Sequence, residues 1–243
     1  MKQNKYDNVI FFNKYRNMER SINGLESAGE WHELKKMLPA FQGKRVLDLG
    51  CGFGWHCRYA AENGAESVVG VDISQKMLEE AQNKTESGRI RYICTPIEDI
   101  SFPPDSFEIV LSSLAFHYVR SFGDIVHRVS GCLSSGGVFI FSVEHPVFTA
   151  QGKQDWHCDE KGNRLHWPVD RYFDEGERNA VFLGEEIIKY HKTLTTYIKS
   201  LIAAGFEITG FTEPKPADDM MSHPGMKDEL RRPMMLIISA KKR

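Results

Sequence analysis

Three glycines stand at alternate positions in the stretch VLDLGCGFGWHCRYA, residues 46–60, and an acid precedes them. The glycines are Gly50, Gly52 and Gly54, and Asp48 lies two residues before the first. Glycines at this spacing let a ligand come very close to the backbone. An acid at this place would repel a phosphate and would suit a cation. The pattern therefore predicts a binding loop for a positively charged ligand.

Two other nucleotide-binding loops fit this stretch poorly. The phosphate-binding pattern G-x-x-x-x-G-K-[ST] has no match in the chain. The dinucleotide pattern G-x-G-x-x-G needs a third glycine where the chain has Trp55 or Cys57. Because that glycine lets a helix pack closely on a strand, a Trp or a Cys is a poor replacement. The sequence thus disfavours a pyrophosphate ligand.

The elements that position this loop alternate between short apolar runs and helical patterns from residue 44 to residue 143. In one of the helices, Ser74 is the predicted N-cap, and Met77, Leu78 and Ala81 form the inner face. Strands that alternate with helices predict a parallel sheet covered on both faces, and continuous apolar runs fit buried strands. The predicted strands are Arg45–Gly50, Ser67–Asp72, Ile90–Thr95, Phe107–Ser113 and Gly137–Val143.

On these residues the chain resembles the class I S-adenosylmethionine-dependent methyltransferases. The resemblance rests on the D-x-G-x-G-x-G pattern, on Asp72 at the end of the second strand, and on PIEDISFPPDSFEIVLSSLAFHYV, residues 96–119. It is similar in detail to the type 11 group, which includes enzymes of ubiquinone and menaquinone biosynthesis. The resemblance implies an α/β fold, a Rossmann-like doubly wound sheet of seven strands in the order 3-2-1-4-5-7-6 with the last strand antiparallel. Two late apolar runs, EITGFTEP and PMMLIISAKK, agree with strands six and seven.

The resemblance implies S-adenosyl-L-methionine as the cofactor. Its sulfonium and ammonium groups are cationic, which gives Asp48 a purpose. We expect Asp72 to accept the ribose hydroxyls, and Tyr15 or Arg20 to reach the cofactor carboxylate. Pro96 stands where the family commonly has an Asp for the adenine amino group, so that contact must be missing or must come from another residue. The predicted cofactor site comprises Tyr15, Arg20, Asp48, Gly50, Cys51, Gly52, Gly54, Asp72, Ile73, Met77, Ile97, Glu98, Ser113 and Leu114.

The candidates for catalysis are ionisable side chains that follow the fourth and fifth strands, together with His191, which precedes the helix after the insertion. In open α/β sheets ligands bind at the carboxyl ends of the strands, and a general base helps if the acceptor is a hydroxyl or a protonated amine. Each candidate also has a structural alternative, namely capping or packing. No two histidines have metal-ligand spacing on one element, so we predict no metal. The candidate catalytic residues are His117, Glu144, His145 and His191.

The chain is predicted to be one methyltransferase domain over residues 1–243, with four parts. Residues 1–43 form a helical cover in which Phe12, Tyr15 and Met18 have helical spacing, and this face packs on the sheet or covers the cofactor. Residues 44–143 form the cofactor-binding core. Residues 144–190, rich in aromatic and ionisable side chains, form a lid that carries acceptor specificity. Residues 191–243 hold a helix and the last two strands, joined by an exposed connection, KPADDMMSHPGMKDELR.

Composition restricts the partners. The net charge is −2, with 41% hydrophobic and 26% charged residues, so no overall field recruits nucleic acid. The fourth strand is followed by SSLA, without the [DNS]-P-P-[YFW] pattern of amino methylation on bases. We therefore expect a small-molecule acceptor with an O, N or C nucleophile. A nicotinamide-dependent oxidoreductase and a non-catalytic S-adenosylmethionine-binding module are the alternatives.

Cysteines and apolar runs bear on the location of the protein. Five scattered cysteines without a CxxC pair argue for reduced thiols. No apolar run has the length of a signal peptide or a membrane span. We expect a cytoplasmic protein without membrane contact that is a monomer or a homodimer.

Overall fold

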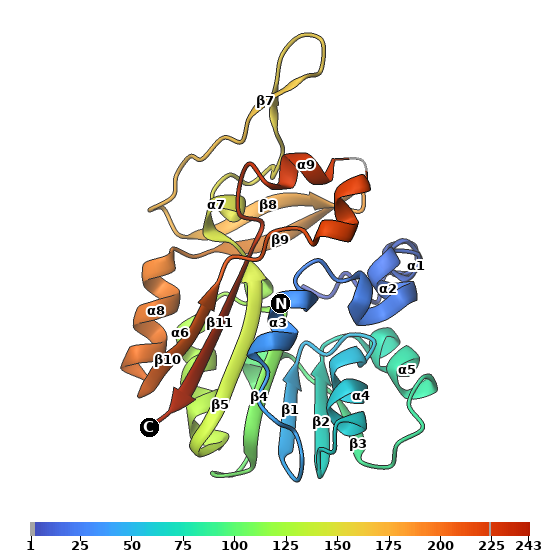
Figure 1. Cartoon of the computed structure of the whole chain (residues 1–243), viewed down its shortest axis with the longest axis vertical. Coiled ribbons are helices and arrows are strands. Elements are labelled where there is room, and N and C mark those ends of the chain that lie inside the picture. The colour runs from blue at the N-terminus through green and yellow to red at the C-terminus, as the bar shows by residue number, and fades with distance from the viewer. Residues whose placement is uncertain (1–2, 224) are drawn as a thin grey trace.

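The computed structural model of the protein describes residues 3–223 and 225–243. Seven strands form one sheet in the order β10-β11-β5-β4-β1-β2-β3 (Figure 1). Strand β11 is antiparallel to both β5 and β10, and the pairs among β1 to β5 are parallel. Numbered along the chain, these strands follow the order 3-2-1-4-5-7-6, so the predicted fold class is confirmed. The sheet strands are β1 (Arg45–Leu49), β2 (Ser67–Asp72), β3 (Ile90–Cys94), β4 (Phe107–Ser113), β5 (Leu133–Glu144), β10 (Phe206–Thr212) and β11 (Met235–Lys242).

Helices cover both faces of the sheet. On one face, Trp31 of α3, Ala60 of α4 and Leu78 of α5 belong to one buried apolar cluster. On the other face, Ile125 of α6 and Leu201 of α8 belong to a second, larger cluster. Because both faces of the sheet are buried, the sequences of β1, β2 and β4 are largely continuous apolar runs. The covering helices are α3 (Trp31–Met37), α4 (Trp55–Glu62), α5 (Gln75–Asn83), α6 (Phe122–Cys132) and α8 (Leu194–Ala203).

The remaining elements lie beyond the carboxyl ends of the parallel strands (Figure 1). A short hairpin, β6–β7, projects farthest from the sheet, and a longer hairpin, β8–β9, lies between it and the body. These elements are α1 (Val9–Arg16), α2 (Glu19–Asn23), α7 (Pro146–Thr149), α9 (Met226–Glu229), β6 (His157–Cys158), β7 (Arg164–His166), β8 (Gly176–Phe182) and β9 (Glu185–His191). Four 3₁₀ turns complete the set: η1 (Gly24–Ser27), η2 (Ile97–Asp99), η3 (Phe116–Tyr118) and η4 (Asp218–Ser222).

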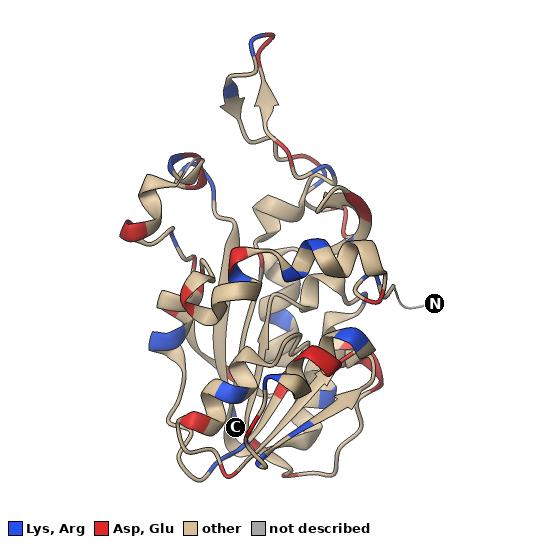
Figure 2. Ribbon diagram, turned by 90° about the vertical axis from the view of Figure 1, so that its right-hand side faces the viewer, with Lys and Arg blue, Asp and Glu red and all other residues tan. Residues whose placement is uncertain are grey.

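Charge is distributed without a dominant sign. In the view of Figure 2, Lys and Arg alternate with Asp and Glu over the body and the projecting hairpin. None of the helices in the described part of the chain has the length and apolarity that crossing a membrane requires.

Most predicted core elements have the expected bounds. Strands β2 and β4 coincide with the prediction, and Ser74 caps α5 by accepting a hydrogen bond from the Met77 amide at 3.2 Å. Strand β5 begins four residues earlier than predicted, at Leu133, because the Ser-Ser-Gly-Gly stretch continues the strand. The division into four parts stays an interpretation of the sequence.

Candidate active site

A cavity of about 900 Å³ opens at the carboxyl ends of β1, β2, β4 and β5. Its wall comes from the N-terminal helices, the glycine loop, the end of β2 with α5, the turn after β3, the ends of β4 and β5, the β8–β9 hairpin, and the segment between β10 and β11. Of the predicted cofactor residues, those that line it are Tyr15, Arg20, Gly50, Gly52, Asp72, Ile73, Met77, Ile97, Glu98, Ser113 and Leu114. Of the predicted catalytic residues, His117 and Glu144 line it.

The glycine loop has the close packing that its sequence predicts. Gly50 and Gly54 have φ of 76° and 70°, a region that disfavours side chains. A Cβ on Gly50 would stand 2.4 Å from the Cβ of Ala115, and one on Gly54 would stand 2.2 Å from the Tyr92 hydroxyl. Leu114, which lines the cavity opposite this loop, also has a positive φ of 52°. A leucine in this conformation is strained, and such strain is concentrated at functional sites.

Asp72 joins the glycine loop to α5. One carboxylate oxygen accepts the Gly52 amide hydrogen at 2.9 Å, and the other accepts that of Ser74 at 2.9 Å. Burial raises the pKa of Asp72, and these two amide hydrogen bonds oppose the rise. Each oxygen keeps a lone pair free of these two bonds, so the carboxylate can accept two further hydrogen bonds from a ligand in the cavity.

A side pocket of about 50 Å³ extends from the glycine loop towards the N-terminal helices. It shares Arg20 and Ser113 with the main cavity, and Trp55 and Cys51 line it. Behind it, Glu30 is 1% exposed and accepts from the Ser113 hydroxyl at 2.9 Å. Within the described part of the chain, the second Glu30 oxygen and the Trp55 Nε1 are buried without a hydrogen-bond partner. The side pocket therefore offers an unused donor, the Trp55 Nε1–H, next to the Arg20 guanidinium, whereas Glu30 does not line the pocket and pairs with that guanidinium at 3.5 Å.

The N-terminal segment, residues 3–16, lines the cavity and has contacts at both of its ends. At the end near α5, Asp7 accepts hydrogen bonds from the Ser74 hydroxyl at 2.6 Å and the Lys76 amide at 3.1 Å. At the other end, the Tyr6 hydroxyl lies 3.5 Å from that of Tyr118, and Phe11 is buried against the β8–β9 hairpin. Both ends of the cavity thus depend on this segment.

A buried charge pair stands at the end of β5. The Lys189 ammonium donates to one Glu144 oxygen at 2.5 Å, and the Gln154 amide donates to the other at 2.8 Å. Burial works to raise the pKa of Glu144, but the charge of Lys189 and the hydrogen bonds from Lys189 and Gln154 prevail and lower it. Glu144 is therefore ionised, and its side chain is 14% exposed where that of Lys189 is 4% exposed.

His117 faces this pair in its neutral form. Burial lowers the pKa of His117 to about 3, although the Glu144 charge opposes that shift. Its Nδ1 accepts the Glu144 amide hydrogen at 3.5 Å, which leaves the proton on Nε2, 4.0 Å from a Glu144 oxygen. The Nε2–H thus lies near the carboxylate, at a distance too long for a hydrogen bond.

Lys192 fixes the turn that carries His117. Its ammonium donates to the carbonyl oxygens of Phe116 at 3.2 Å, Val119 at 2.6 Å and Tyr190 at 3.2 Å. Three acceptors match the three hydrogens of the ammonium. The side chain therefore ties the turn η3 to strand β9, and both line the cavity.

Methionines form the wall opposite the glycine loop. We call Met220, Met226, Met234 and Met235, with Pro214 and Pro216, the methionine wall; all six line the cavity. The segment was predicted to be an exposed connection, and η4 and α9 contain no buried residue, but Met220 and Met226 of this connection line the cavity. The signal that could have shown it is the group of three methionines in an otherwise hydrophilic run.

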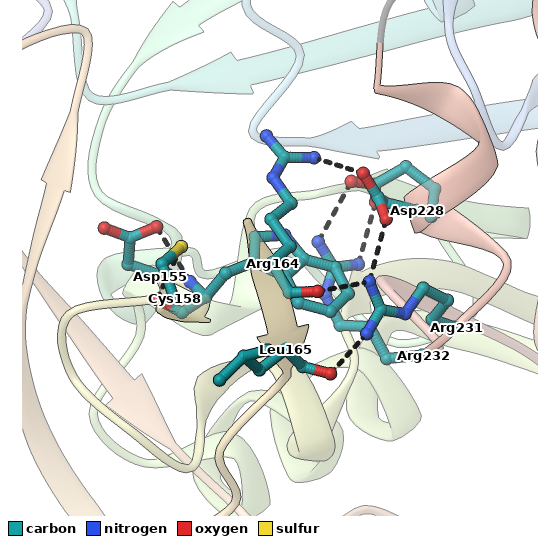
Figure 3. A network of polar contacts seen from close by, with 9 residues as sticks. Asp155, Cys158, Arg164, Leu165, Asp228, Arg231 and Arg232 are labelled. Atoms are coloured by element: carbon teal, nitrogen blue, oxygen red, sulfur yellow. Dashed lines mark hydrogen bonds and ion pairs between the residues drawn. The ribbon is translucent and has the colours of Figure 1, made fainter. Parts of the chain in front are cut away.

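An arginine network holds the methionine wall from outside (Figure 3). Asp228 of α9 pairs with Arg164 of the β6–β7 hairpin at 2.9 Å and with Arg231 at 2.9 Å. Arg231 also donates to the Leu165 carbonyl oxygen at 2.6 Å. Arg232 lies 4.2 Å from the Trp167 ring centroid. The first half of the 144–190 insertion thus supports the wall from behind, while Phe182, Ile187, Ile188 and Tyr190 of the second half line the cavity.

Several predicted site residues lie elsewhere. His191 bonds to Thr149 and to the Tyr172 carbonyl oxygen, both at 2.8 Å, and His145 caps α7 and pairs with Glu213 at 2.8 Å. Neither lines the cavity. Asp48 is 1% exposed beneath the loop, where it accepts from the Cys57 thiol at 3.2 Å. Like Gly54, it does not line the main cavity, and Cys51 lines only the side pocket.

Metal binding was not predicted. Within residues 3–223 and 225–243, no group of three or more His, Cys, Asp or Glu side chains is placed to hold a metal ion.

Known proteins share this architecture. Residues 47–141 match a family model described as methyltransferase domain. The solved structure of a protein from Listeria monocytogenes, assigned to the S-adenosylmethionine-dependent methyltransferases, is 60% identical with a TM-score of 0.87, covering 90% of this chain and 99% of its own. An S-adenosylmethionine-dependent methyltransferase from Mesorhizobium loti is 42% identical with a TM-score of 0.84, covering 90% and 100%. An uncharacterized protein of Haemophilus influenzae is 36% identical over 98% of this chain and 96% of its own.

The chain belongs to the S-adenosylmethionine-dependent methyltransferases. The extent of the match to the Listeria and Mesorhizobium proteins carries this assignment, because it includes nearly the whole of both. It is an enzyme of this class, and its cofactor is S-adenosyl-L-methionine. The predicted resemblance is thereby confirmed, and the nicotinamide-dependent alternative has no support.

Proposed function

We propose that the protein transfers a methyl group from S-adenosyl-L-methionine to an O, N or C nucleophile of a small molecule. The cavity of about 900 Å³ carries this proposal. It is continuous from the glycine loop to Glu144, and its volume is typical of sites for small ligands. One space thus serves both cofactor and acceptor.

The adenosine part of the cofactor fits the end of the cavity near β2 and β3. Asp72 has one lone pair on each oxygen for the two ribose hydroxyls. Ile73, Ile97 and Glu98 line the same end and would surround the adenine. Pro96 also lines it, so the side chain that commonly binds the adenine amino group is replaced here by an apolar ring.

The methionine part of the cofactor fits the side pocket. The Arg20 guanidinium and the unused Trp55 Nε1–H suit a carboxylate. The Glu30 carboxylate, which lies behind the pocket and is bonded to Arg20 and Ser113, would attract an ammonium group by its charge. Tyr15, Gly50 and Ser113 line both cavities and stand where the two parts of the cofactor would join. The buried groups without partners are explained if a zwitterion binds here, since such groups are costly when they stay unpaired.

The bound cofactor supplies a methyl carbon whose bond to sulfur breaks, with the electron pair passing to sulfur, as an acceptor lone pair forms the new bond to carbon. The protein's residues hold the acceptor in line and exclude water. Burial raises the pKa of Tyr6 and Tyr118 well above the usual value, so both phenols stay protonated as donors in the cavity. Glu144 is the ionised acceptor of hydrogen bonds among these groups.

Transfer of a labelled methyl group tests the proposal. The protein is incubated with methyl-labelled cofactor and a cell extract separated by ultrafiltration into small molecules and retained macromolecules. We expect label in the small-molecule fraction, and less of it with Asp72→Ala. Label confined to retained protein or nucleic acid would overturn the small-molecule acceptor. The cytoplasmic location and the monomeric or homodimeric state stay predictions.

A further inference from the structure

The residues at the acceptor end of the cavity differ sharply in polarity from one side to the other. Four of the methionines that line the cavity belong to the methionine wall at this end: Met220, Met226, Met234 and Met235. Methionine is flexible and polarisable and fits apolar ligands of varied shape, so it is common on surfaces that bind several partners. Phe182, Ile187 and Ile188 of the β8–β9 hairpin add to the apolar lining.

The Glu144 carboxylate is an ionised group at the acceptor end of the cavity. Its partner cation, the Lys189 ammonium, lies behind it and away from the cavity. The Glu144 side chain is 14% exposed and lines the cavity, whereas that of Lys189 is 4% exposed and does not line it. Each Glu144 oxygen receives one hydrogen bond from the protein, from Lys189 or from Gln154. The lone pairs that remain face a ligand as hydrogen-bond acceptors.

The apolar and polar parts meet at one place in the sheet. Met235 of β11 pairs directly with Glu144 of β5 in the antiparallel register. Side chains of directly paired residues lie on the same face of a sheet, about 5 Å apart at Cβ. A ligand that reaches Glu144 therefore has the methionine wall beside it. Two other charged residues line this part of the cavity and differ from Glu144 in their surroundings. Glu229 pairs with Arg232 at 2.8 Å, and Arg120 is exposed to solvent.

We propose that the methyl acceptor is an amphipathic small molecule, with an apolar body against the methionine wall and an N–H or O–H group that donates to Glu144. This inference rests on the proposed function, because it names the class of acceptor for the same site. An acceptor whose polar end is only a carboxylate has no hydrogen to donate to Glu144 and carries the same charge, so we expect it to bind more weakly.

Titration calorimetry with simple amphiphiles tests the inference. The protein is first saturated with S-adenosyl-L-homocysteine, whose own titration shows that the cofactor half is intact. The probes are n-alkylamines, 1-alkanols and n-alkanoates from butyl to octyl. We expect amines and alkanols to bind about fourfold more tightly for each added methylene, and alkanoates of equal length to bind about tenfold more weakly. Affinity independent of chain length, or alkanoates that bind as tightly as alkanols, would overturn the proposal.

Two pairs of variants locate the two parts of the site. Met220→Ser with Met226→Ser should weaken the octyl probes about tenfold and leave S-adenosyl-L-homocysteine affinity unchanged. Met221→Ser is the matched control, because Met221 is a neighbour on the same turn that does not line the cavity. If Met221→Ser weakens the octyl probes as much as the double variant Met220→Ser with Met226→Ser does, the methionine wall is not the binding surface.

The head group is tested by Glu144→Gln with Lys189→Gln, which removes both charges and leaves none buried alone. We expect the preference for amines and alkanols over alkanoates to disappear, while the dependence on chain length stays. A preference that survives in the folded double variant would exclude Glu144 as the binding group. Failure of all these probes, with labelled small molecules still formed from the extract, would overturn this inference alone and leave the proposed function standing.

Discussion

Asp48→Asn is a test of the electrostatics beneath the glycine loop. Asp48 is 1% exposed, and one of its oxygens accepts from the Cys57 thiol at 3.2 Å. Burial raises the pKa of Asp48 from 3.8 to about 7, against the opposing bond from Cys57 and with a small contribution from Asp72. A difference of about three pKa units corresponds to about 4 kcal/mol between the protonated and ionised forms.

The sign of this effect follows from proton binding. The folded protein holds the Asp48 proton more tightly than the unfolded chain does. Stability is therefore highest below the unfolded pKa and decreases as the pH rises towards the folded pKa of about 7. Between about pH 5 and about pH 9, the ionisation of Asp48 should lower the free energy of unfolding by about 3 kcal/mol. Asn keeps an acceptor for Cys57 and does not titrate.

Urea unfolding of the wild type and Asp48→Asn across this pH range measures the effect. The difference in free energy of unfolding should move by about 3 kcal/mol in favour of the variant from about pH 5 to about pH 9. Glu86→Gln is the control, because Glu86 is exposed. If the difference for Asp48→Asn stays as constant with pH as that for Glu86→Gln, the reasoning about the buried carboxyl is refuted.

Three further predictions concern the cavity. Asp72→Ala should weaken S-adenosyl-L-homocysteine binding about tenfold or more by calorimetry, because two charge-assisted hydrogen bonds are lost; an unchanged dissociation constant in the folded variant would refute the assignment. Arg20→Gln should weaken S-adenosyl-L-homocysteine at least tenfold and leave adenosine binding unchanged; the exposed Arg16→Gln is its control, and an equal loss for adenosine would speak against the side pocket. Lys192→Met should slow labelled methyl transfer about tenfold with unchanged cofactor affinity, because the turn that carries His117 loses its anchor; a wild-type rate would contradict that role.

The cofactor half of the fold was largely predictable from the sequence. Residues 45–113 form strands and helices through local patterns, and the glycine spacing requires a tight loop whatever surrounds it. Asp72 and Ser113 end β2 and β4, and the ends of parallel strands meet at one edge of the sheet. Position at a strand end was therefore enough to place these side chains in the cavity.

The acceptor half was predicted less well, because its residues meet only through tertiary contacts. The β8–β9 hairpin was missed, although every second residue of β9 is buried, from Ile187 to His191. Its turn at Leu183 and Gly184 has positive φ at both residues, and a leucine there gives no sequence signal for a turn. The pairing of Glu144 with Lys189 joins residues 45 positions apart, so spacing could not reveal it.

His145 and His191 show the limit of reasoning from residue type. His145 follows the end of β5 and His191 is the last residue of β9, and catalytic residues are often found at such places. His145 caps a short helix and His191 joins Thr149 to the Tyr172 carbonyl, so their nitrogen atoms are used within the fold. A histidine near a strand end can act in catalysis or can stabilise the fold, and the hydrogen-bond partners around its ring distinguish the two roles.

The N-terminal segment has a consequence for the order of events in turnover. Asp7 binds the first turn of α5 at the cofactor end, while Tyr6 and Phe11 pack at the acceptor end. If this segment moves to admit the methyl donor, the same movement removes part of the acceptor surface. The acceptor surface is complete only after the donor has entered, which predicts compulsory-order kinetics with the donor first and the demethylated cofactor leaving last. In steady-state inhibition, S-adenosyl-L-homocysteine should compete with the donor and not with the acceptor.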